Sequence, residues 1–282
     1  MGECSHDCAS CAKKKEDACS GETNFKVPAN ASSHIRRVVA VMSGKGGVGK
    51  SLVTELLAVA AVKRGLKVAI LDADITGPSI PTAFGIRERA VADEEGQILP
   101  CRSMGGIGVM SLNLLVENPS DPVVWRGPVI AGVVKQFWSD VQWGEVDVMF
   151  VDMPPGTGDV PLTVFQSLPV DAAVVVTAPQ ELVALIVEKA VRMAGMMKIP
   201  VTGLVENMSA FKCPDCGKVH ALFGAGKARE LAARYDIPSE AELPIDPRLA
   251  ALVDDGRIEE AEVSALDDIL NAALGLDNLN SK

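Results

Sequence analysis

The segment Gly44–Ser51, with the sequence GKGGVGKS, constrains the fold of this chain more than any other feature. It matches the phosphate-binding P-loop pattern GxxxxGK[ST] in the right context, since the apolar run Val38–Met42 precedes it and a helical pattern begins at Lys50. In such a loop backbone N–H groups converge on phosphate oxygens, and the following helix adds the positive end of its dipole. A tight strand-to-helix connection without a ligand is the less favoured alternative. The sequence therefore predicts nucleotide binding.

The P-loop pattern also assigns roles to single residues. The residues expected around the phosphates are Gly44, Lys45, Gly46, Gly47, Val48, Gly49, Lys50 and Ser51. Lys50 is expected to neutralise phosphate charge and Ser51 to bind Mg²⁺. The run Val148–Asp152 (VMFVD) is typical of a Walker B strand, which delivers an aspartate to the Mg²⁺ ion. Asp72 and Asp74 follow another predicted strand, where one would contact the metal and the other would orient a water molecule.

From residue 35 onward, short β-branched runs alternate with longer helical patterns, which favours a doubly wound α/β fold with a mostly parallel sheet. The predicted strands are Val38–Met42, Lys67–Leu71, Ile107–Leu112, Asp147–Val151, Ala172–Thr177, Val201–Val205 and Ala241–Leu243, and the predicted helices are Lys50–Arg64, Pro128–Val141, Glu181–Met197, Lys227–Tyr235 and Ala265–Leu274. Residues 87–101 indicate a surface hairpin or excursion. We expect residues 35–282 to form one P-loop domain and residues 1–34 to be a flexible, disordered cysteine-rich tail and linker.

The charge distribution bears on the partners that the chain can bind. The net charge is −10, and residues 236–282 carry 12 acidic and 3 basic side chains, a local charge of −9. Because no basic stripe is available to meet phosphates or anionic lipids, we expect neither a nucleic-acid nor a membrane partner. No apolar stretch approaches the roughly 20 residues that span a bilayer, and the N-terminus is polar, so we expect a cytoplasmic protein.

Six of the seven cysteines lie in two groups, which in a reducing compartment favours metal binding over disulfides. Cys213 and Cys216 form a CxxC motif in CPDCG, a tight turn that directs two thiolates at one metal. The spacing leaves zinc and an iron–sulfur cluster open. The other group, Cys4, Cys8, Cys11 and Cys19, is a complete four-thiolate set for a cluster or a zinc ion.

Lys45 is not required by the simple P-loop pattern, and its presence resembles the deviant Walker A ATPases, a class that includes MinD, ParA and the nitrogenase iron protein. Within this class the chain looks like the Mrp branch of iron–sulfur cluster carrier ATPases. The segments that carry the resemblance are Val124–Val129 (VWRGPV), Val151–Thr163 (VDMPPGTGDVPLT), Val205–Ser209 (VENMS) and Cys213–Gly217 (CPDCG). Together with the loop, the resemblance covers roughly residues 36–257.

That resemblance implies an ATP-bound homodimer in which Lys45 reaches the partner's nucleotide. It also implies that Asp74 positions the attacking water, that Asn207 contacts adenine, and that Ser51 and Asp152 serve Mg²⁺. The catalytic residues expected on this basis are Lys45, Lys50 and Asp74.

For the CxxC motif, the resemblance implies that Cys213 and Cys216 of two subunits bridge a [4Fe–4S] cluster, which the protein hands to apo-proteins while hydrolysing ATP slowly. Loops near Asp74 and Gly156 would report the nucleotide state to this motif. The tail cysteines differ in spacing from the four-cysteine motif of some relatives, so a tail cluster is a separate hypothesis.

Two other functions compete with cluster delivery. A MinD- or ParA-type positioning ATPase, with a structural zinc ion at the CxxC motif, needs a basic amphipathic tail to bind membranes. Residues 264–282 instead carry three acids and one lysine. A reductase like the nitrogenase iron protein is the other alternative, but the two cluster cysteines of that family lie far apart in sequence, whereas here they share one CxxC motif.

Overall fold

The computed structural model describes residues 26–74, 77, 79–94, 96–116, 127–179 and 183–276 of the 282-residue chain. The described strands are β1 (His34–Ile35), β2 (Val38–Met42), β3 (Val68–Asp72), β4 (Cys101–Arg102), β5 (Gly108–Met110), β6 (Glu145–Val146), β7 (Val148–Asp152), β8 (Ala172–Thr177), β9 (Val201–Lys212), β10 (Val219–His220) and β11 (Glu240–Ile245). The described α-helices are α1 (Lys50–Lys63), α2 (Ile80–Ala83), α3 (Gly127–Ser139), α4 (Asp159–Ser167), α5 (Val183–Met196), α6 (Ala228–Arg234), α7 (Pro247–Asp254) and α8 (Asp267–Leu274).

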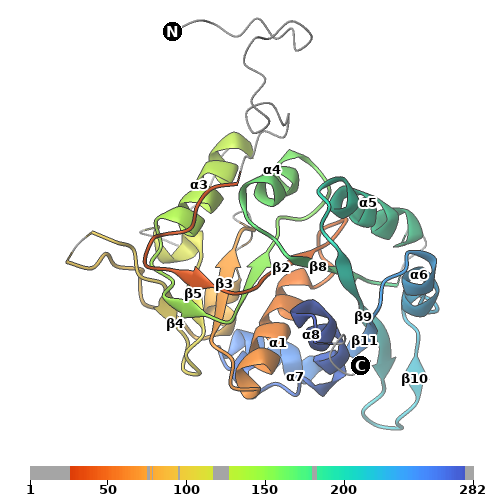
Figure 1. Cartoon of the computed structure of the whole chain (residues 1–282). Coiled ribbons are helices and arrows are strands. Elements are labelled where there is room, and N and C mark those ends of the chain that lie inside the picture. The colour runs from red at the N-terminus through yellow and green to blue at the C-terminus, as the bar shows by residue number, and fades with distance from the viewer. Residues whose placement is uncertain are drawn as a thin grey trace, which may run out of the picture.

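Nine of the described strands form one sheet in the order β10-β9-β8-β2-β7-β3-β5-β4, with β11 paired to β9 (Figure 1). From β9 to β5 neighbouring strands are parallel, whereas β10 and β4 pair antiparallel with β9 and β5. All five residues of the central strand β2 are apolar and buried, a pattern typical of parallel strands that are covered on both faces. The predicted doubly wound α/β fold is confirmed.

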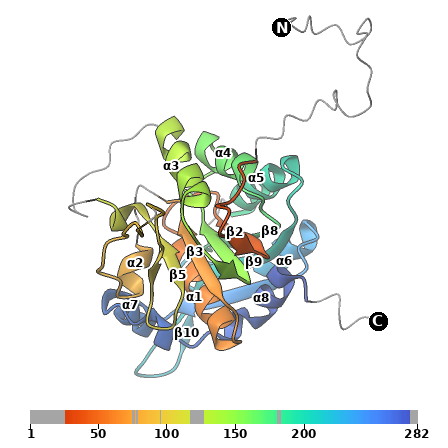
Figure 2. The same ribbon diagram turned by 60° about the vertical axis from the view of Figure 1, so that its left-hand side comes forward.

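Helices cover both faces of the sheet, as the two ribbon views show (Figures 1 and 2). On one face α3, α4, α5 and α6 enclose a core that includes Phe137, Trp138 and Phe165. On the other face α1, α2 and α8 enclose a second core, with α7 packed against it. Leu57 of α1 and Ile269 of α8 are fully buried there. Helix α1 packs between the sheet and α8, so most of its residues are buried. The helix that follows the P-loop is therefore fixed against the sheet.

The predicted elements match the observed ones closely in the parallel core and less well near its edges. β9 extends to Lys212, well beyond the predicted end at Val205. Helix α7 was not predicted, although its start has a clear local signal: the Asp246 side chain accepts the Arg248 N–H, and Pro247 follows the cap. The hairpin predicted over residues 87–101 is seen as an antiparallel bridge between Ala92 and Ile98.

Residues 26–33 differ from the predicted flexible linker. The Val27 N–H donates to Ser167 O at 2.8 Å, and the Trp138 indole N–H donates to Val27 O at 2.9 Å. Val27 and Ala29 also pack against the core. An extended segment with isolated apolar residues has no periodicity in sequence, so only its docking reveals that it belongs to the domain. The predicted disordered tail, with its four cysteines, lies outside the described residues.

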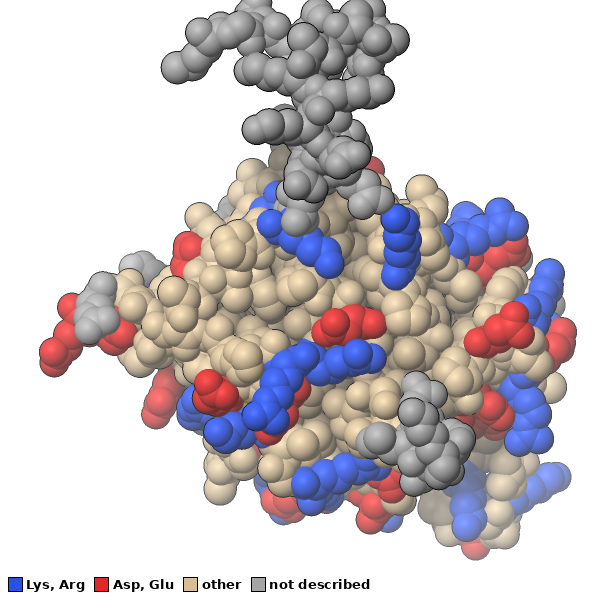
Figure 3. Space-filling model, in the orientation of Figure 1, with Lys and Arg blue, Asp and Glu red and all other residues tan. Residues whose placement is uncertain are grey.

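None of the helices that the structure describes is long and apolar enough to cross a membrane. On the face shown in Figure 3, basic and acidic side chains are interspersed over the surface.

Candidate functional site

The P-loop lies between the end of β2 and the start of α1, at the carboxyl edge of the sheet. Gly47 and Gly49 have φ angles of 76° and 82°, a left-handed backbone that glycine adopts without steric cost. A Cβ atom on Gly49 would lie 2.1 Å from Asn207 Nδ2, and one on Gly44 would lie 2.6 Å from the Ile186 carbonyl oxygen. Close packing from β9 and α5, as well as backbone conformation, therefore requires glycines in this loop.

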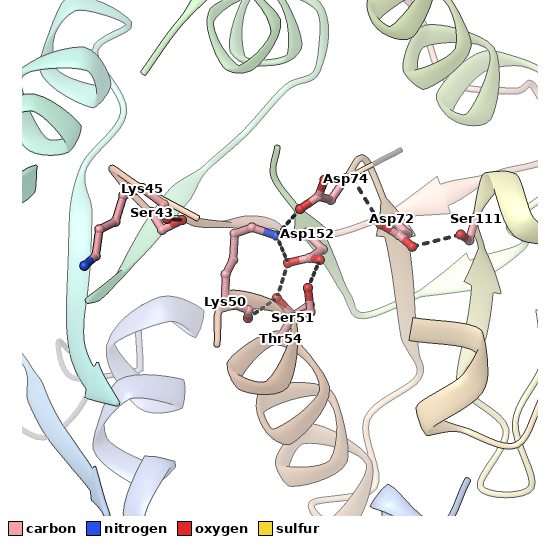
Figure 4. Close-up of polar contacts among 9 residues, drawn as sticks. All are labelled: Ser43, Lys45, Lys50, Ser51, Thr54, Asp72, Asp74, Ser111 and Asp152. Atoms are coloured by element: carbon pink, nitrogen blue, oxygen red, sulfur yellow. Dashed lines mark hydrogen bonds and ion pairs between the residues drawn. The ribbon is translucent and has the colours of Figure 1, made fainter. Parts of the chain in front are cut away.

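Asp152, the last residue of β7, accepts hydrogen bonds from three side chains of α1 (Figure 4). Its Oδ1 accepts from Lys50 Nζ and Thr54 Oγ1, both at 2.9 Å, and its Oδ2 accepts from Ser51 Oγ at 2.6 Å. The carboxylate is fully buried. A buried charge is tolerated only when it is paired and hydrogen-bonded, and these contacts meet that requirement.

Lys50 is buried between two carboxylates, because Asp74 Oδ2 lies 3.3 Å from Lys50 Nζ on the side away from α1. Burial of the ammonium lowers the pKa of Lys50, but the charges of Asp152 and Asp74 outweigh burial and raise it above its ordinary value. Lys50 therefore stays charged in the ligand-free protein. A phosphate that enters the loop would compete with these two carboxylates for the same ammonium.

Asp72 ends β3 and Asp74 lies two residues later, and the two aspartates have different surroundings. The Asp72 carboxylate points away from Lys50 and accepts from Ser111 Oγ at 2.8 Å and from the Asp74 N–H at 3.1 Å (Figure 4). Burial raises the pKa of Asp72 to about 8, and the nearby Asp152 charge adds to this shift. Asp72 thus shapes the turn, whereas Asp74 lies next to Lys50.

Lys45 and Asn207, whose roles the family resemblance implied, make different contacts with the loop. Lys45 extends away from the Lys50–Asp152 group (Figure 4), and its carbonyl accepts from Ser43 Oγ at 2.8 Å. Asn207 is buried on β9 and donates from Nδ2 to Val48 O at 3.0 Å. Asn207 therefore contacts the loop backbone itself.

A cavity of about 650 Å³ opens beside the loop, a size within the usual range for small-molecule sites. Its polar end is formed by the loop together with Lys50, Ser51 and Asp74. The other end is lined mostly by apolar residues, namely Met208, Phe223, Pro244, Ile245, Leu249, Ala250 and Val253, together with Asp246 and Asp254. Such a division suits a ligand with anionic and aromatic parts.

Two residues at this site, Thr54 and Glu55, were missed in the sequence. Thr54 completes the contacts of Asp152, and its position one turn after Lys50 is a signal that would have identified it. Glu55 lines the cavity although it is almost fully buried. Burial raises the pKa of Glu55 well above its usual range, and the Asp152 and Asp72 charges add to the shift.

The CPDCG turn connects β9 to β10, and we call residues 212–220 the cysteine hairpin. The Cys213 N–H donates to Lys218 O and the Gly217 N–H donates to Cys213 O, both at 2.9 Å. Backbone N–H groups of Cys216 and Asp215 bond the Cys213 sulfur and lower the pKa of its thiol. Among the residues that the structure describes, no three His, Cys, Asp or Glu side chains form a metal-binding group. One cysteine hairpin thus supplies two thiols of the four that a cluster or zinc ion needs.

The contact between Gly49 and Asn207 can be tested by comparing two alanine variants. Gly47→Ala and Gly49→Ala both force a left-handed φ on alanine, at a cost of roughly 1–2 kcal/mol each. Only Gly49→Ala also displaces Asn207 from Val48 O, which should cost about 1 kcal/mol more. Urea unfolding measures the loss of unfolding free energy in each variant. Equal losses for Gly47→Ala and Gly49→Ala would contradict the predicted steric clash.

The raised pKa of Asp72 predicts a pH-dependent stability. The folded state keeps this proton up to about pH 8, whereas the unfolded chain loses it near pH 4. The folded state therefore binds more protons in this range, and its stability falls as the pH rises through it. In nucleotide-free and Mg²⁺-free protein, the free energy of unfolding of Asp72→Asn relative to wild type should increase up to about pH 8 and then level off. A difference in unfolding free energy between Asp72→Asn and wild type that does not change with pH would contradict this prediction.

The chain is similar in sequence to known iron-sulfur cluster proteins. The chain is 44% identical to the iron-sulfur cluster carrier protein of Clostridium perfringens, covering 90% of this chain and 93% of that protein. It is 35% identical to the cytosolic Fe-S cluster assembly factor CFD1 of Saccharomyces cerevisiae, covering 83% and 82% of the two chains.

Solved structures give the same result for the fold. The nucleotide-binding protein of Archaeoglobus fulgidus, solved in complex with ADP and with cobalt found by PIXE, has 48% sequence identity and a TM-score of 0.74, covering 83% of this chain and 91% of that one. The MinD cell division ATPase of Pyrococcus furiosus shares the fold at 18% identity and a TM-score of 0.58, covering 86% and 99%. A family model described as NUBPL iron-transfer P-loop NTPase, of the ParA type, matches residues 34–274. The chain therefore belongs to the ParA-type family of NUBPL iron-transfer P-loop NTPases.

Proposed function

We propose that this protein is a homodimeric ATPase that binds ATP with Mg²⁺, hydrolyses it slowly, and carries a [4Fe–4S] cluster to apo-proteins. The observation that carries the proposal is that one strand joins the two sites. β9 contributes Asn207 and Met208 to the cavity, and Cys213 follows the last residue of the same strand. The names of the bacterial and yeast relatives support cluster delivery, and the yeast name supports a cytoplasmic location.

The polar end of the cavity suits a magnesium nucleotide. Ser51 Oγ and Asp152 Oδ2 lie 2.6 Å apart, and hydroxyl and carboxylate oxygens are the hard ligands that Mg²⁺ prefers. When bound, Mg²⁺ would neutralise charge on the terminal phosphates. Lys50 would exchange its carboxylate partners for phosphate oxygens, and Asp74 would then be released to orient the attacking water. The ADP complex of the Archaeoglobus relative supports this assignment.

The homodimer is proposed from the position of Lys45. Its side chain extends away from the Lys50–Asp152 group (Figure 4), and Lys45 is not among the described residues that line the cavity of its own subunit. We place this lysine at the nucleotide of a second subunit that faces the loop, as the resemblance to the deviant Walker A ATPases implies. In a two-fold dimer each subunit would then supply Lys45 to its partner's site.

Mixing two inactive variants tests this arrangement. Lys45→Ala and Asp74→Asn proteins should each lose ATP hydrolysis, because one lacks the lysine given to the partner and the other lacks the water-positioning carboxylate. In a mixed dimer one site regains Lys45 from the partner together with its own Asp74, so part of the phosphate release should return. The control is Lys45→Ala protein mixed with the double variant Lys45→Ala/Asp74→Asn. In this mixture no site regains Lys45. Absence of recovery in the first mixture would contradict the exchange of Lys45 between subunits.

The cluster is proposed as cargo held between two cysteine hairpins. Each hairpin presents Cys213 and Cys216 at the surface, with Cys216 exposed. The hydrogen bonds that lower the pKa of the Cys213 thiol favour the thiolate, which is the form that ligates metals. Two hairpins supply four thiolates, the number that a [4Fe–4S] cluster requires. The tail cysteines Cys4, Cys8, Cys11 and Cys19 remain a separate proposal for a second site.

Anaerobic reconstitution tests the bridging cluster. The double variant Cys213→Ala/Cys216→Ala should lose about four iron and four sulfide ions per dimer relative to wild type, as measured by metal analysis and Mössbauer spectroscopy. Cys101→Ala is the matched control, because this thiol lies on β4 and is half-buried. The iron content of a Cys8→Ala/Cys11→Ala variant, compared with that of wild type, measures how much iron the tail holds. Tight zinc binding by the cysteine hairpin with no iron uptake would instead favour the positioning ATPase with a structural zinc ion.

A further inference from the structure

The apolar end of the cavity contains an aromatic side chain that comes from the segment just after the cysteine hairpin. Phe223 lies three residues after the end of β10 and is the aromatic residue among the described lining of the cavity. Its side chain is 47% exposed, so much of the ring remains available for contact. Neighbouring Leu222 is 57% exposed but does not line the cavity. The two residues thus differ in the surface that they face.

The loop that carries Phe223 is anchored at both ends to β9. At one end β10 pairs with β9 through Val219 and His220. At the other end the Lys227 N–H donates to Glu206 Oε2 at 2.9 Å, and a Cβ atom on Gly226 would lie 2.5 Å from Glu206 Oε1. Glu206 is fully buried and precedes Asn207. Phe223 is therefore tied to the same strand that carries the cavity-lining Asn207 and leads to Cys213.

We propose that Phe223 packs on the base of the bound nucleotide and thereby links occupancy of the cavity to the position of the cysteine hairpin. This inference rests on the proposed function and deepens it by naming the contact through which the nucleotide reaches the cysteines. Aromatic rings favour stacking on nucleobases because every base has a π-face. Since the ring is half-exposed without a ligand, stacking would also remove apolar surface from water.

This connection is shorter than the one expected from the sequence. Asp74 follows β3 and Gly156 follows β7. Two strands, β2 and β8, lie between β7 and β9, and β7 itself lies between these strands and β3. With adjacent strands about 4.8 Å apart, β3 lies roughly 19 Å from β9 across the sheet. Phe223 and Asn207, in contrast, belong to the cysteine-bearing strand and the loop attached to it.

Isothermal titration calorimetry of the full-length, cluster-free protein tests the contact with the base. Phe223→Ala should weaken Mg²⁺–ADP binding about 10-fold, as expected for the loss of one stacking contact. Binding of Mg²⁺–tripolyphosphate, which has no base, should stay unchanged, and Leu222→Ala should leave both affinities unchanged. The proposal would be overturned if Phe223→Ala bound both ligands more weakly by the same factor, or if its affinity for Mg²⁺–ADP were unchanged. If the wild type does not bind ADP, the proposed function fails as well.

Alkylation of the cysteines tests the link to the hairpin. In wild type, saturating Mg²⁺–ADP should change the rates at which iodoacetamide modifies Cys213 and Cys216, resolved from the other cysteines by peptide mass spectrometry. In Phe223→Ala at saturating ADP this change should be lost, and in Leu222→Ala it should persist. The same nucleotide-dependent change in wild type and Phe223→Ala, or no change in wild type that binds ADP, would refute the coupling while leaving nucleotide binding intact.

Discussion

The carboxylate of Asp152 accepts hydrogen bonds from three side chains of α1, and the geometry of the P-loop depends on this group. Lys50, Ser51 and Thr54 come from the first turns of the helix, whereas Asp152 ends a strand about one hundred residues later. Taking such a charge out of water is costly unless its partners are complete. The interaction therefore fixes where α1 starts relative to the sheet, and it holds the ammonium and the hydroxyl that the phosphate and Mg²⁺ would use.

The sheet determines which functional groups meet. β2 lies between β7 and β8, so the P-loop emerges beside the end of β7 and close to Asp152. β9 lies two strands away from β2 and extends past the sheet's carboxyl edge, where Asn207 contacts the loop backbone. Because β9 continues to the cysteine hairpin, the nucleotide cavity and the two thiols are connected by a few residues of one strand. In a family of iron-transfer NTPases, this continuity is the reason we propose a link between nucleotide and cluster.

Much of the fold followed from the sequence because its central strands are unbroken apolar runs, each followed by a helix with an apolar face. Val38–Met42 and Ala172–Thr177 were predicted at their observed bounds for this reason. Predictions were weaker where the signal was not periodic. The docked segment near Val27 and the outer part of β9 are stabilised by contacts with distant elements, such as Trp138 and β11. Local patterns carry no information about such contacts.

The sequence by itself determined the P-loop, the carboxylate that ends β7 and the presence of a CxxC turn, because each is encoded by residues that are close together in the chain. Only the tertiary structure decided which carboxylates face Lys50, since Asp72 and Asp74 are two residues apart yet one bonds Ser111 and the other lies beside the ammonium. It also decided that Phe223 lines the cavity together with the P-loop. These relations depend on strand order and side-chain direction, which arise when distant segments pack against one another.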